Sequence, residues 1–366
     1  MFWPLNRLPR FDGRPAPTDL RFHGQTILIT AASGGVGLAA AKSLAERGLS
    51  ALIVTARTEQ KAADTKHAIE AHIETALPNL HPARRPTIIA LVLEMNDAES
   101  MLNFVTNLMT HVCYLDHAIL NAAVLANTHS LNPSTGYEES VHVNAVAPIF
   151  LSVQLLPLLL GSRLTGETNP ALRPHLTIIS SGSCWRVDMN GELRNLYSTT
   201  TPLAWLSEPS NFATKFTEQY SRSKLMMEHA MRRLAFLGDV EKDQGDGGAP
   251  DPMILVGSAT PGPTASDLLR RSERDSLFYV FLLRFVGWIR RRPEIGANCY
   301  ISSLGLGLEG RGEQLEVDEI ATGERVKNVK SGESIKLGDV VWEELLSVLK
   351  QMDKAGDGLV AQYLGE

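Results

Sequence analysis

The fold is decided by one stretch, which reads Gln25-Thr26-Ile27-Leu28-Ile29-Thr30, then Ala31-Ala32-Ser33-Gly34-Gly35-Val36-Gly37, then an alanine-rich segment that ends at Gly48. The first run is apolar and β-branched, which is typical of a buried strand, and the last has the composition of a helix. Backbone N–H groups at a helix start attract an anion, and small residues let a pyrophosphate approach. A glycine-rich turn without these neighbours is usually only a turn, so the strand–turn–helix order predicts a dinucleotide site.

Strands and helices alternate along the rest of the chain. The expected strands are 51–55, 87–93, 116–121, 176–179 and 253–256, and the expected helices are 58–77, 97–111, 134–161, 220–234 and 339–353. Such alternation predicts an α/β fold of the Rossmann type: a doubly wound parallel sheet with helices on both faces. We expect residues 1–22 to form an N-terminal arm and 23–366 a single nucleotide-binding domain. Residues 238–251 are acidic and glycine-rich and are expected to form a mobile loop.

Composition narrows the class of protein. With 366 residues, 44% hydrophobic and 21% charged, the chain can bury a large core. A net charge of −6 argues against nucleic acid or an anionic membrane as the main partner. The three cysteines have no metal-ligand spacing, and their odd number fits a reducing compartment. No signal peptide and no uninterrupted run of 18 apolar residues is present, so we expect a cytoplasmic protein without a membrane span and without a metal.

A second informative stretch is Tyr220-Ser221-Arg222-Ser223-Lys224, at the start of an expected helix. Four residues make about one helical turn, so Tyr220 and Lys224 share a face. A phenol titrates near ~10 in water, and a cation one turn away is expected to lower that pKa and make Tyr220 a general acid/base. A single Tyr-x-x-x-Lys pair is weak evidence alone. Its position downstream of the nucleotide site strengthens it.

Several short motifs then follow one another in a familiar order. They are Thr30 with Gly35-x-Gly37, Asn121-Ala122-Ala123, Asn144, Ser181, Tyr220-x-x-x-Lys224 and Pro261-Gly262. In this order, over about residues 24–305, the chain resembles a short-chain dehydrogenase/reductase of the retinol-dehydrogenase-like kind found among fungal biosynthetic reductases. The family usually has glycine where this chain has Ala31 and Ala123. Both residues are small, so the turn is expected to survive with some strain and with a less certain affinity for the cofactor.

The resemblance implies roles for individual residues. Tyr220 would exchange the proton of the substrate oxygen, and Ser181 would polarise that oxygen. Lys224 would anchor the nicotinamide ribose and tune Tyr220, and Asn144 would support a proton relay. From the residues alone, Asn144 is a structural residue of an apolar helix, and Ser181 is a turn residue at a strand end.

The cofactor is expected to be NADP(H) rather than NAD(H). Arg57 follows the second strand, where an acid would bind the ribose hydroxyl of NAD and an arginine accommodates a 2′-phosphate. An exposed arginine is also commonly just solvated. The residues expected to bind the cofactor are Thr30, Ala31, Ser33, Gly35, Val36, Gly37, Arg57, Glu94, Met95, Asn121, Ala122, Tyr220, Lys224, Pro261, Gly262 and Ser266.

Two segments are expected to be inserted around the active site. Ser181 lies much further before Tyr220 than is usual in the family, which predicts an insertion at about 184–219. Its apolar residues either cover the site or form a small core of their own; they are Trp185, Leu196, Tyr197, Leu203, Trp205 and Leu206. The second segment, about 263–292, carries an apolar helical face within 277–289. That face would line a substrate pocket, form a homodimer seam or lie on a membrane surface, in that order of preference.

The sequence therefore predicts an NADP(H)-dependent oxidoreductase acting on a carbonyl or secondary alcohol of a bulky apolar metabolite, in secondary metabolism. Two alternatives stay open. One is a cofactor-binding sensor or scaffold without redox turnover, suggested by the two glycine replacements. The other is a lyase or isomerase that uses the same tyrosine as acid/base.

Overall fold

The computed structural model describes residue 17 and residues 19–164, 172–189, 192–213, 217–237, 253–264, 291–317 and 319–365. Within these ranges eight strands form one sheet in the order β3-β2-β1-β4-β5-β6-β7-β8. Their bounds are β1 (Thr26–Ile29), β2 (Ala51–Ala56), β3 (Thr87–Val92), β4 (His117–Leu120), β5 (His175–Ile179), β6 (Leu255–Thr260), β7 (Gln314–Glu316) and β8 (Glu319–Ile320). Strands β1 to β7 are parallel and β8 is antiparallel to β7, which confirms the doubly wound Rossmann-type fold.

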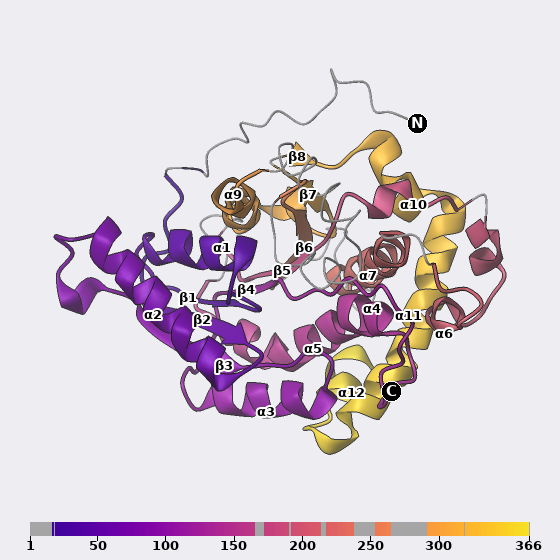
Figure 1. The fold of residues 1–366 in the computed structure, drawn as a ribbon, viewed down its shortest axis with the longest axis horizontal. Helices are drawn as coiled ribbons and strands as arrows, with labels where there is room; N and C mark the ends of the chain where they lie inside the picture. Colours follow the sequence, from indigo (N-terminus) through magenta and orange to yellow (C-terminus); the bar gives the residue numbers. More distant parts are fainter. Residues whose placement is uncertain are drawn as a thin grey trace, which may run out of the picture.

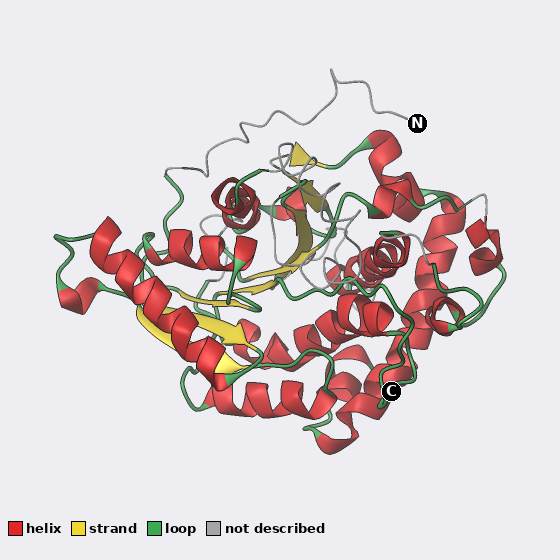
Figure 2. Ribbon diagram, viewed as in Figure 1, coloured by secondary structure: helices red, strands yellow, loops and turns green. Residues whose placement is uncertain are grey.

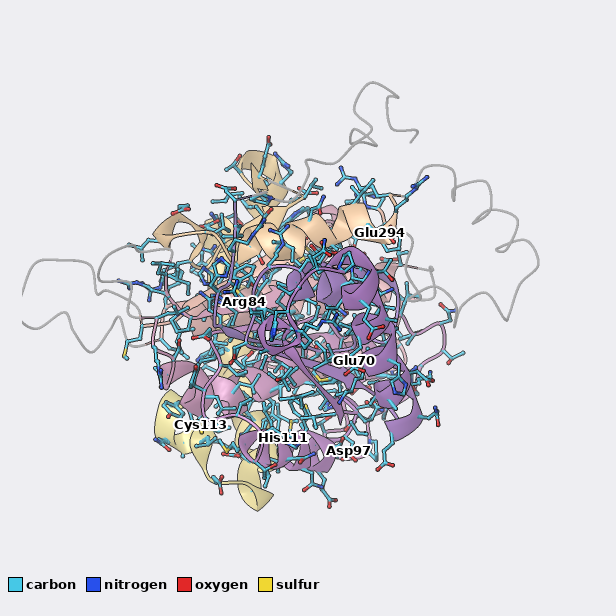
Figure 3. All side chains as sticks on the ribbon, turned by 90° about the vertical axis from the view of Figure 1, so that its left-hand side faces the viewer. Glu70, Arg84, Asp97, His111, Cys113 and Glu294 are labelled. Carbon is cyan, nitrogen blue, oxygen red and sulfur yellow. The ribbon has the colours of Figure 1, made fainter. Side chains whose placement is uncertain are left out.

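Helices cover both faces of the sheet (Figure 1; Figure 2). One face is covered by α1 (Gly35–Ala45), α2 (Glu59–Ala76) and α9 (Pro293–Ser303). The other is covered by α3 (Ala98–Met109), α4 (Glu139–Val141), α5 (Ala147–Leu160), α7 (Glu218–Ala235) and α11 (Gly332–Met352). In the side view, Glu294 of α9 lies in the upper part of the molecule, and Asp97 and His111, on either side of α3, lie in the lower part (Figure 3). Three short helices complete the described part: α6 (Pro202–Ser207), α10 (Lys327–Lys330) and α12 (Leu359–Leu364).

Two hydrophobic cores result from the alternation of side chains along the strands. Ile27 and Ile29 of β1 belong to the core beneath α1, α2 and α9. Leu28, between them, belongs to the larger core beneath α3, α5, α7 and α11. Because strand order reverses between β1 and β4, the carboxyl ends of these strands form the crevice where a doubly wound sheet binds its ligand.

Several predicted boundaries were wrong. The sixth strand runs Leu255–Thr260, beyond the predicted 253–256, because Gly257 and Ser258 interrupt the apolar pattern without ending the strand. The last long helix starts at Gly332 instead of 339. The helix predicted from 134 starts at Glu139, after a turn in which the Asn132 side chain accepts backbone N–H bonds. The short strands β7 and β8 were not predicted.

The described part of the insertion shares the main core. Leu196, Leu203 and Leu206 are buried in the same cluster as Leu337 and Leu345 of α11. Glu344 of α11 accepts hydrogen bonds from the backbone N–H groups that begin α6, at 2.7 and 2.8 Å. The insertion therefore has no separate small core among the described residues, and it is tied to the C-terminal helix.

One described helical run, Glu139–Leu160, is long and apolar enough to cross a membrane by length and composition. The sequence does not predict a membrane span here, because polar residues interrupt the apolar run. Within the fold, 83% of its most apolar window is buried, which is how the core helix of a globular fold behaves.

Candidate active site

The turn after β1 has the geometry of an anion site. Helix α1 begins at Gly35, and its N-cap residue Gly34 has no side chain with which to cap the first N–H groups. A Cβ atom on Gly37 would lie 2.6 Å from Asn121 Nδ2 and 2.7 Å from the Ala31 carbonyl oxygen. Only glycine fits there. The start of α1 is thereby drawn close to the end of β4, and the turn fits the pyrophosphate of a dinucleotide.

Ala31 has a φ of 52°, in the left-handed region. Its N–H donates to Thr55 Oγ1 at 3.0 Å, which ties the turn to β2. The expected strain at this position is therefore present. Ser33 is exposed, whereas Val36 is buried beneath the turn at 6% exposure.

Thr30 and Asn121 join the ends of β1 and β4. Thr30 Oγ1 accepts hydrogen bonds from the N–H groups of Asn121 and Ala122, at 2.9 and 3.3 Å. Asn121 Nδ2 donates to the carbonyl oxygens of Thr30 and Ala31. The hydroxyl of buried Tyr300, on α9, donates to Asn121 Oδ1 at 2.7 Å. These groups hold the crevice rigid, and sequence reasoning missed Tyr300 because it lies beyond the last motif.

Arg57 is exposed immediately after β2. Because β2 is parallel to β1 and pairs with it through Ile29 and Val54, this arginine comes from the strand end next to the glycine-rich turn. Glu94 is half-buried after β3 and accepts the N–H of Asn96 at 3.1 Å. Met95 is 4% exposed, and its side chain packs in the larger core.

Asn144 lies in a π-helical turn, His142–Val146, between α4 and α5. Its Oδ1 accepts the N–H of Val124 at 2.9 Å, and its Nδ2 donates to the Val124 carbonyl at 2.8 Å and to Ser223 Oγ at 3.0 Å. Both amide protons are therefore used. The side chain fastens the loop after β4 to α7, as a structural asparagine does, and π-helical turns occur frequently at functional sites.

Ser181 and Tyr220 meet at the carboxyl end of β5. Burial raises the pKa of the Tyr220 phenol to about 12, and a hydrogen bond with Ser181 opposes that rise. The expected net lowering of this pKa was wrong, because burial is the largest effect. Lys224 Nζ is 6.0 Å from the centre of the Tyr220 ring and donates instead to the Ile179 carbonyl at 2.7 Å. A buried phenol of this kind keeps its proton at neutral pH.

Lys224 is 1% exposed. Burial lowers the pKa of its ammonium to about 8, and the nearby Glu228 carboxyl partly restores it. Sequence reasoning missed Glu228, although a carboxylate one turn after Lys224 on a buried helix is a visible signal. Cys184, fully buried beside the same groups, was also missed.

Pro261 and Gly262 follow β6 and are half-buried at the carboxyl edge of the sheet. Ser266 and the apolar residues of 277–289 lie outside the described residues, as do residues 1–16 and the 238–251 loop. The structure thus brings together the carboxyl ends of β1, β4, β5 and β6. The uncapped start of α1 follows β1 at this edge, and Tyr220 and Lys224 lie at the end of β5.

Comparison with known proteins agrees with this arrangement. The family model described as short chain dehydrogenase matches residues 25–167. The chain is 27% identical over 349 residues to the short-chain dehydrogenase anuD of Penicillium roqueforti, covering 94% of this chain and 82% of that protein. It is 28% identical over 363 residues to the short-chain dehydrogenase/reductase ffsI of Aspergillus flavipes, covering 99% and 95%.

The chain is thus similar to short-chain dehydrogenases, by the family model over residues 25–167 and by these fungal proteins over most of its length. The match to the fungal proteins spans nearly the whole chain, and these similarities indicate an oxidoreductase.

Solved structures of other proteins have the same fold as this chain. An uncharacterised protein from Mycobacterium paratuberculosis superposes with a TM-score of 0.59 at 17% identity, covering 92% of this chain and 98% of that one. RhlG of Pseudomonas aeruginosa, solved as an active-site complex with NADP, superposes with a TM-score of 0.54 at 21% identity, covering 81% and 96%.

Proposed function

We propose that this protein is an NADP(H)-dependent oxidoreductase that interconverts a carbonyl group and a secondary alcohol. One observation supports this proposal most strongly. Ser181, Tyr220 and Lys224 lie together at the carboxyl end of β5. The uncapped start of α1 belongs to the same crevice. When bound, the nicotinamide supplies or accepts the hydride.

Residues of the chain transfer the proton to the substrate oxygen and stabilise the negative charge that the transfer leaves on Tyr220. Tyr220, whose phenol is protonated at neutral pH, gives its proton to the carbonyl oxygen during reduction. Ser181 donates a hydrogen bond to the same oxygen and polarises it. Lys224, fixed against the Ile179 carbonyl, provides the positive charge that stabilises the phenolate left behind. These states favour reduction near neutral pH.

The cofactor would be held by the uncapped turn between β1 and α1 and by the ends of β4 and β6. Arg57, exposed beside that turn, supports NADP over NAD because a guanidinium pairs with a 2′-phosphate. RhlG was solved with NADP, and a short chain dehydrogenase from Escherichia coli was solved with NADPH. The preference is tested by titrating both cofactors. Wild type should favour NADPH, and Arg57→Ala should lose on the order of 1–3 kcal/mol of that preference.

The substrate we propose is a bulky, mostly apolar ketone or alcohol of secondary metabolism, in the cytoplasm. Similarity to fungal dehydrogenases supports this class, and the apolar 277–289 segment supplies side chains of the required kind. Cys113 and Cys184 form no disulfide within the part of the chain that the structure describes, which fits a reducing compartment.

The test is to incubate the protein with NADPH and a panel of bulky apolar ketones and to follow the loss of nicotinamide absorbance. Turnover of at least one ketone is expected, with little turnover when NADH replaces NADPH. A sensor or scaffold would bind NADPH, by fluorescence titration, and consume none. A lyase or isomerase would convert substrate at an unchanged NADPH concentration.

A further inference from the structure

The strained turn after β1 is held by hydrogen bonds from two neighbouring strands. Ala31 has a φ of 52°, in the left-handed region that favours glycine. Its N–H donates to Thr55 Oγ1 of β2 at 3.0 Å, and its carbonyl oxygen accepts a hydrogen bond from Asn121 Nδ2, after β4, at 3.1 Å. A residue with a side chain keeps such a conformation only where its surroundings fix it from several directions. The turn therefore depends on how the Asn121 amide is oriented.

The contacts of the Asn121 side chain decide that orientation. Nδ2 lies 3.0 Å from the Thr30 carbonyl oxygen and 3.1 Å from the Ala31 carbonyl oxygen. Because carbonyl oxygens only accept hydrogen bonds, this end of the amide must be the NH₂ group. The other end, Oδ1, lies 2.7 Å from the hydroxyl of Tyr300. Oδ1 carries no proton, so the tyrosine is the donor, and an amide turned by 180° would place Oδ1 against two carbonyl oxygens.

Tyr300 supplies this hydrogen bond from α9, 179 residues further along the chain. Helix α9 packs beside α1 (Figure 1). The tyrosine is 2% exposed and belongs to the same core cluster as Val36 and Ala40 of α1. Burial raises the pKa of its phenol well above the ordinary value, so the hydroxyl keeps the proton that it donates. The packed ring therefore places a fixed donor beneath the turn.

The hydrogen-bonded pair of Asn121 and Ala31 also touches the start of α1. A Cβ atom on Gly37 would lie 2.6 Å from Asn121 Nδ2 and 2.7 Å from the Ala31 carbonyl oxygen. The first turn of α1 is thus in close contact with both groups. Its uncapped N–H groups are those that fit a pyrophosphate. A rotation of the Asn121 amide or of the Ala31 carbonyl would disturb the place where the cofactor is expected to bind.

We propose that Tyr300 is a positioning residue for the cofactor, which holds Ala31 in a conformation that glycine would adopt unaided. The Tyr300 hydroxyl fixes the Asn121 amide, and the amide fixes the Ala31 carbonyl. Tyr300 acts through Asn121 and has no part in the chemical step. The inference rests on the binding of NADPH proposed above, and it adds the residue that makes an alanine acceptable in the turn.

The first test compares two Tyr→Phe variants by fluorescence titration with NADPH. Tyr300→Phe removes the donor to Asn121 Oδ1 and should raise the Kd about three- to tenfold, the effect of one lost hydrogen bond. Tyr137→Phe is the matched control. Tyr137 donates to Glu344 Oε1 at 3.1 Å and packs against the core on the other face of the sheet, so its variant should keep the Kd within about twofold. A Kd for Tyr300→Phe equal to that of wild type would overturn the proposal.

The second test adds Ala31→Gly, whose backbone adopts a φ of 52° without strain. The turn then no longer depends on the Asn121 amide. The double variant with Tyr300→Phe and Ala31→Gly should bind NADPH within about twofold of Ala31→Gly alone. This rescue is specific, because a tyrosine that only filled the core would be equally costly in both backgrounds. If Tyr300→Phe raises the Kd by the same factor with alanine and with glycine at position 31, Tyr300 does not act through Ala31.

The third test uses the protein without cofactor, so it decides the structural part of the proposal even if wild type binds no NADPH and the proposed function fails. Urea denaturation of the four proteins forms a double-mutant cycle. Tyr300→Phe should lower the free energy of unfolding less in the Ala31→Gly background than in wild type, because the strain that it releases is absent there. Tyr137→Phe should have the same effect in both backgrounds. Additive effects of Tyr300→Phe and Ala31→Gly would contradict the coupling of these two residues.

Discussion

At the scale of single residues, Ala31 adopts a backbone conformation that favours glycine. Its φ of 52° is strained for an L-residue by about 1–2 kcal/mol. Ala31→Gly removes this strain but adds about 0.4–1 kcal/mol of unfolded-state entropy. We therefore expect a net gain in unfolding free energy of up to ~1.6 kcal/mol in urea denaturation. Ala32 is the buried neighbour and has no positive φ, so Ala32→Gly should lower the free energy of unfolding. An equal loss of unfolding free energy in Ala31→Gly and Ala32→Gly would contradict the presence of strain at Ala31.

Lys224 predicts how reduction depends on pH. Reduction needs the Tyr220 hydroxyl and the Lys224 ammonium. Burial raises the pKa of Tyr220 to about 12 and lowers the pKa of Lys224 to about 8. The lysine therefore loses its charge first, and kcat for reduction should fall as pH rises through about 8 while Tyr220 is still protonated. The check is a pH profile of kcat with saturating NADPH. A rate that increases through this range would contradict the assignment.

The sequence could indicate which candidate side chains lie near one another, because Ser181 follows a predicted strand and Tyr220 and Lys224 lie in a predicted helix. It could not indicate their ionisation. The pKa of Tyr220 depends on burial by distant parts of the chain, and the direction of the Lys224 side chain depends on the Ile179 carbonyl. Tyr300 was missed because it lies beyond the last motif, and 179 residues separate it from Asn121, its hydrogen-bond partner.

At the scale of elements, α11 closes the larger core over α7 and the insertion. Leu345 is 1% exposed in that cluster. Leu345→Ala should lower the free energy of unfolding by about 2–5 kcal/mol, because truncation leaves a cavity among packed side chains. Glu343→Ala, two residues earlier and exposed, should change it by less than about 0.5 kcal/mol. Similar denaturation midpoints in the two variants would show that α11 is not part of the core.

The order of the elements from β1 to β6 followed from the sequence because each strand is apolar and each crossover contains a helix-length segment. Strands β7 and β8 have three and two residues, too short for a periodic pattern. The start of α11 was placed too late because Gly332 and Gly338 lie within its first turns, although Gly338 packs against His229 of α7.

At the scale of the whole molecule, buried histidines predict sensitivity to acid. Burial lowers the pKa of His142 to about 4 and that of His229 to about 3. An unfolded histidine takes up a proton near ~6.5, so the stability these residues contribute is complete above that pH and is lost as pH falls toward 4. The loss should be about 3 kcal/mol for His142. Urea midpoints measured between pH 7.5 and 5 should fall for wild type, and less steeply for His142→Gln. A flat wild-type response would contradict the burial argument.

The larger core joins residues from Leu28 to Val360, so both ends of the chain depend on the same packed cluster. The prediction of a single domain from 23 to 366 therefore leads us to expect one cooperative transition in calorimetry. Two resolved transitions, or two stable halves after limited proteolysis, would contradict it.

The measurement that bears most directly on the whole account is single-turnover kinetics of Tyr220→Phe with NADPH and an accepted ketone. The substitution keeps the ring and removes only the hydroxyl. Binding of NADPH should be unchanged within about twofold, because Lys224, Arg57 and the turn between β1 and α1 are intact. The chemical step should slow by roughly 10²–10⁴, the contribution of a positioned general acid. Reduction by Tyr220→Phe at the wild-type rate would show that this phenol does not carry the proton.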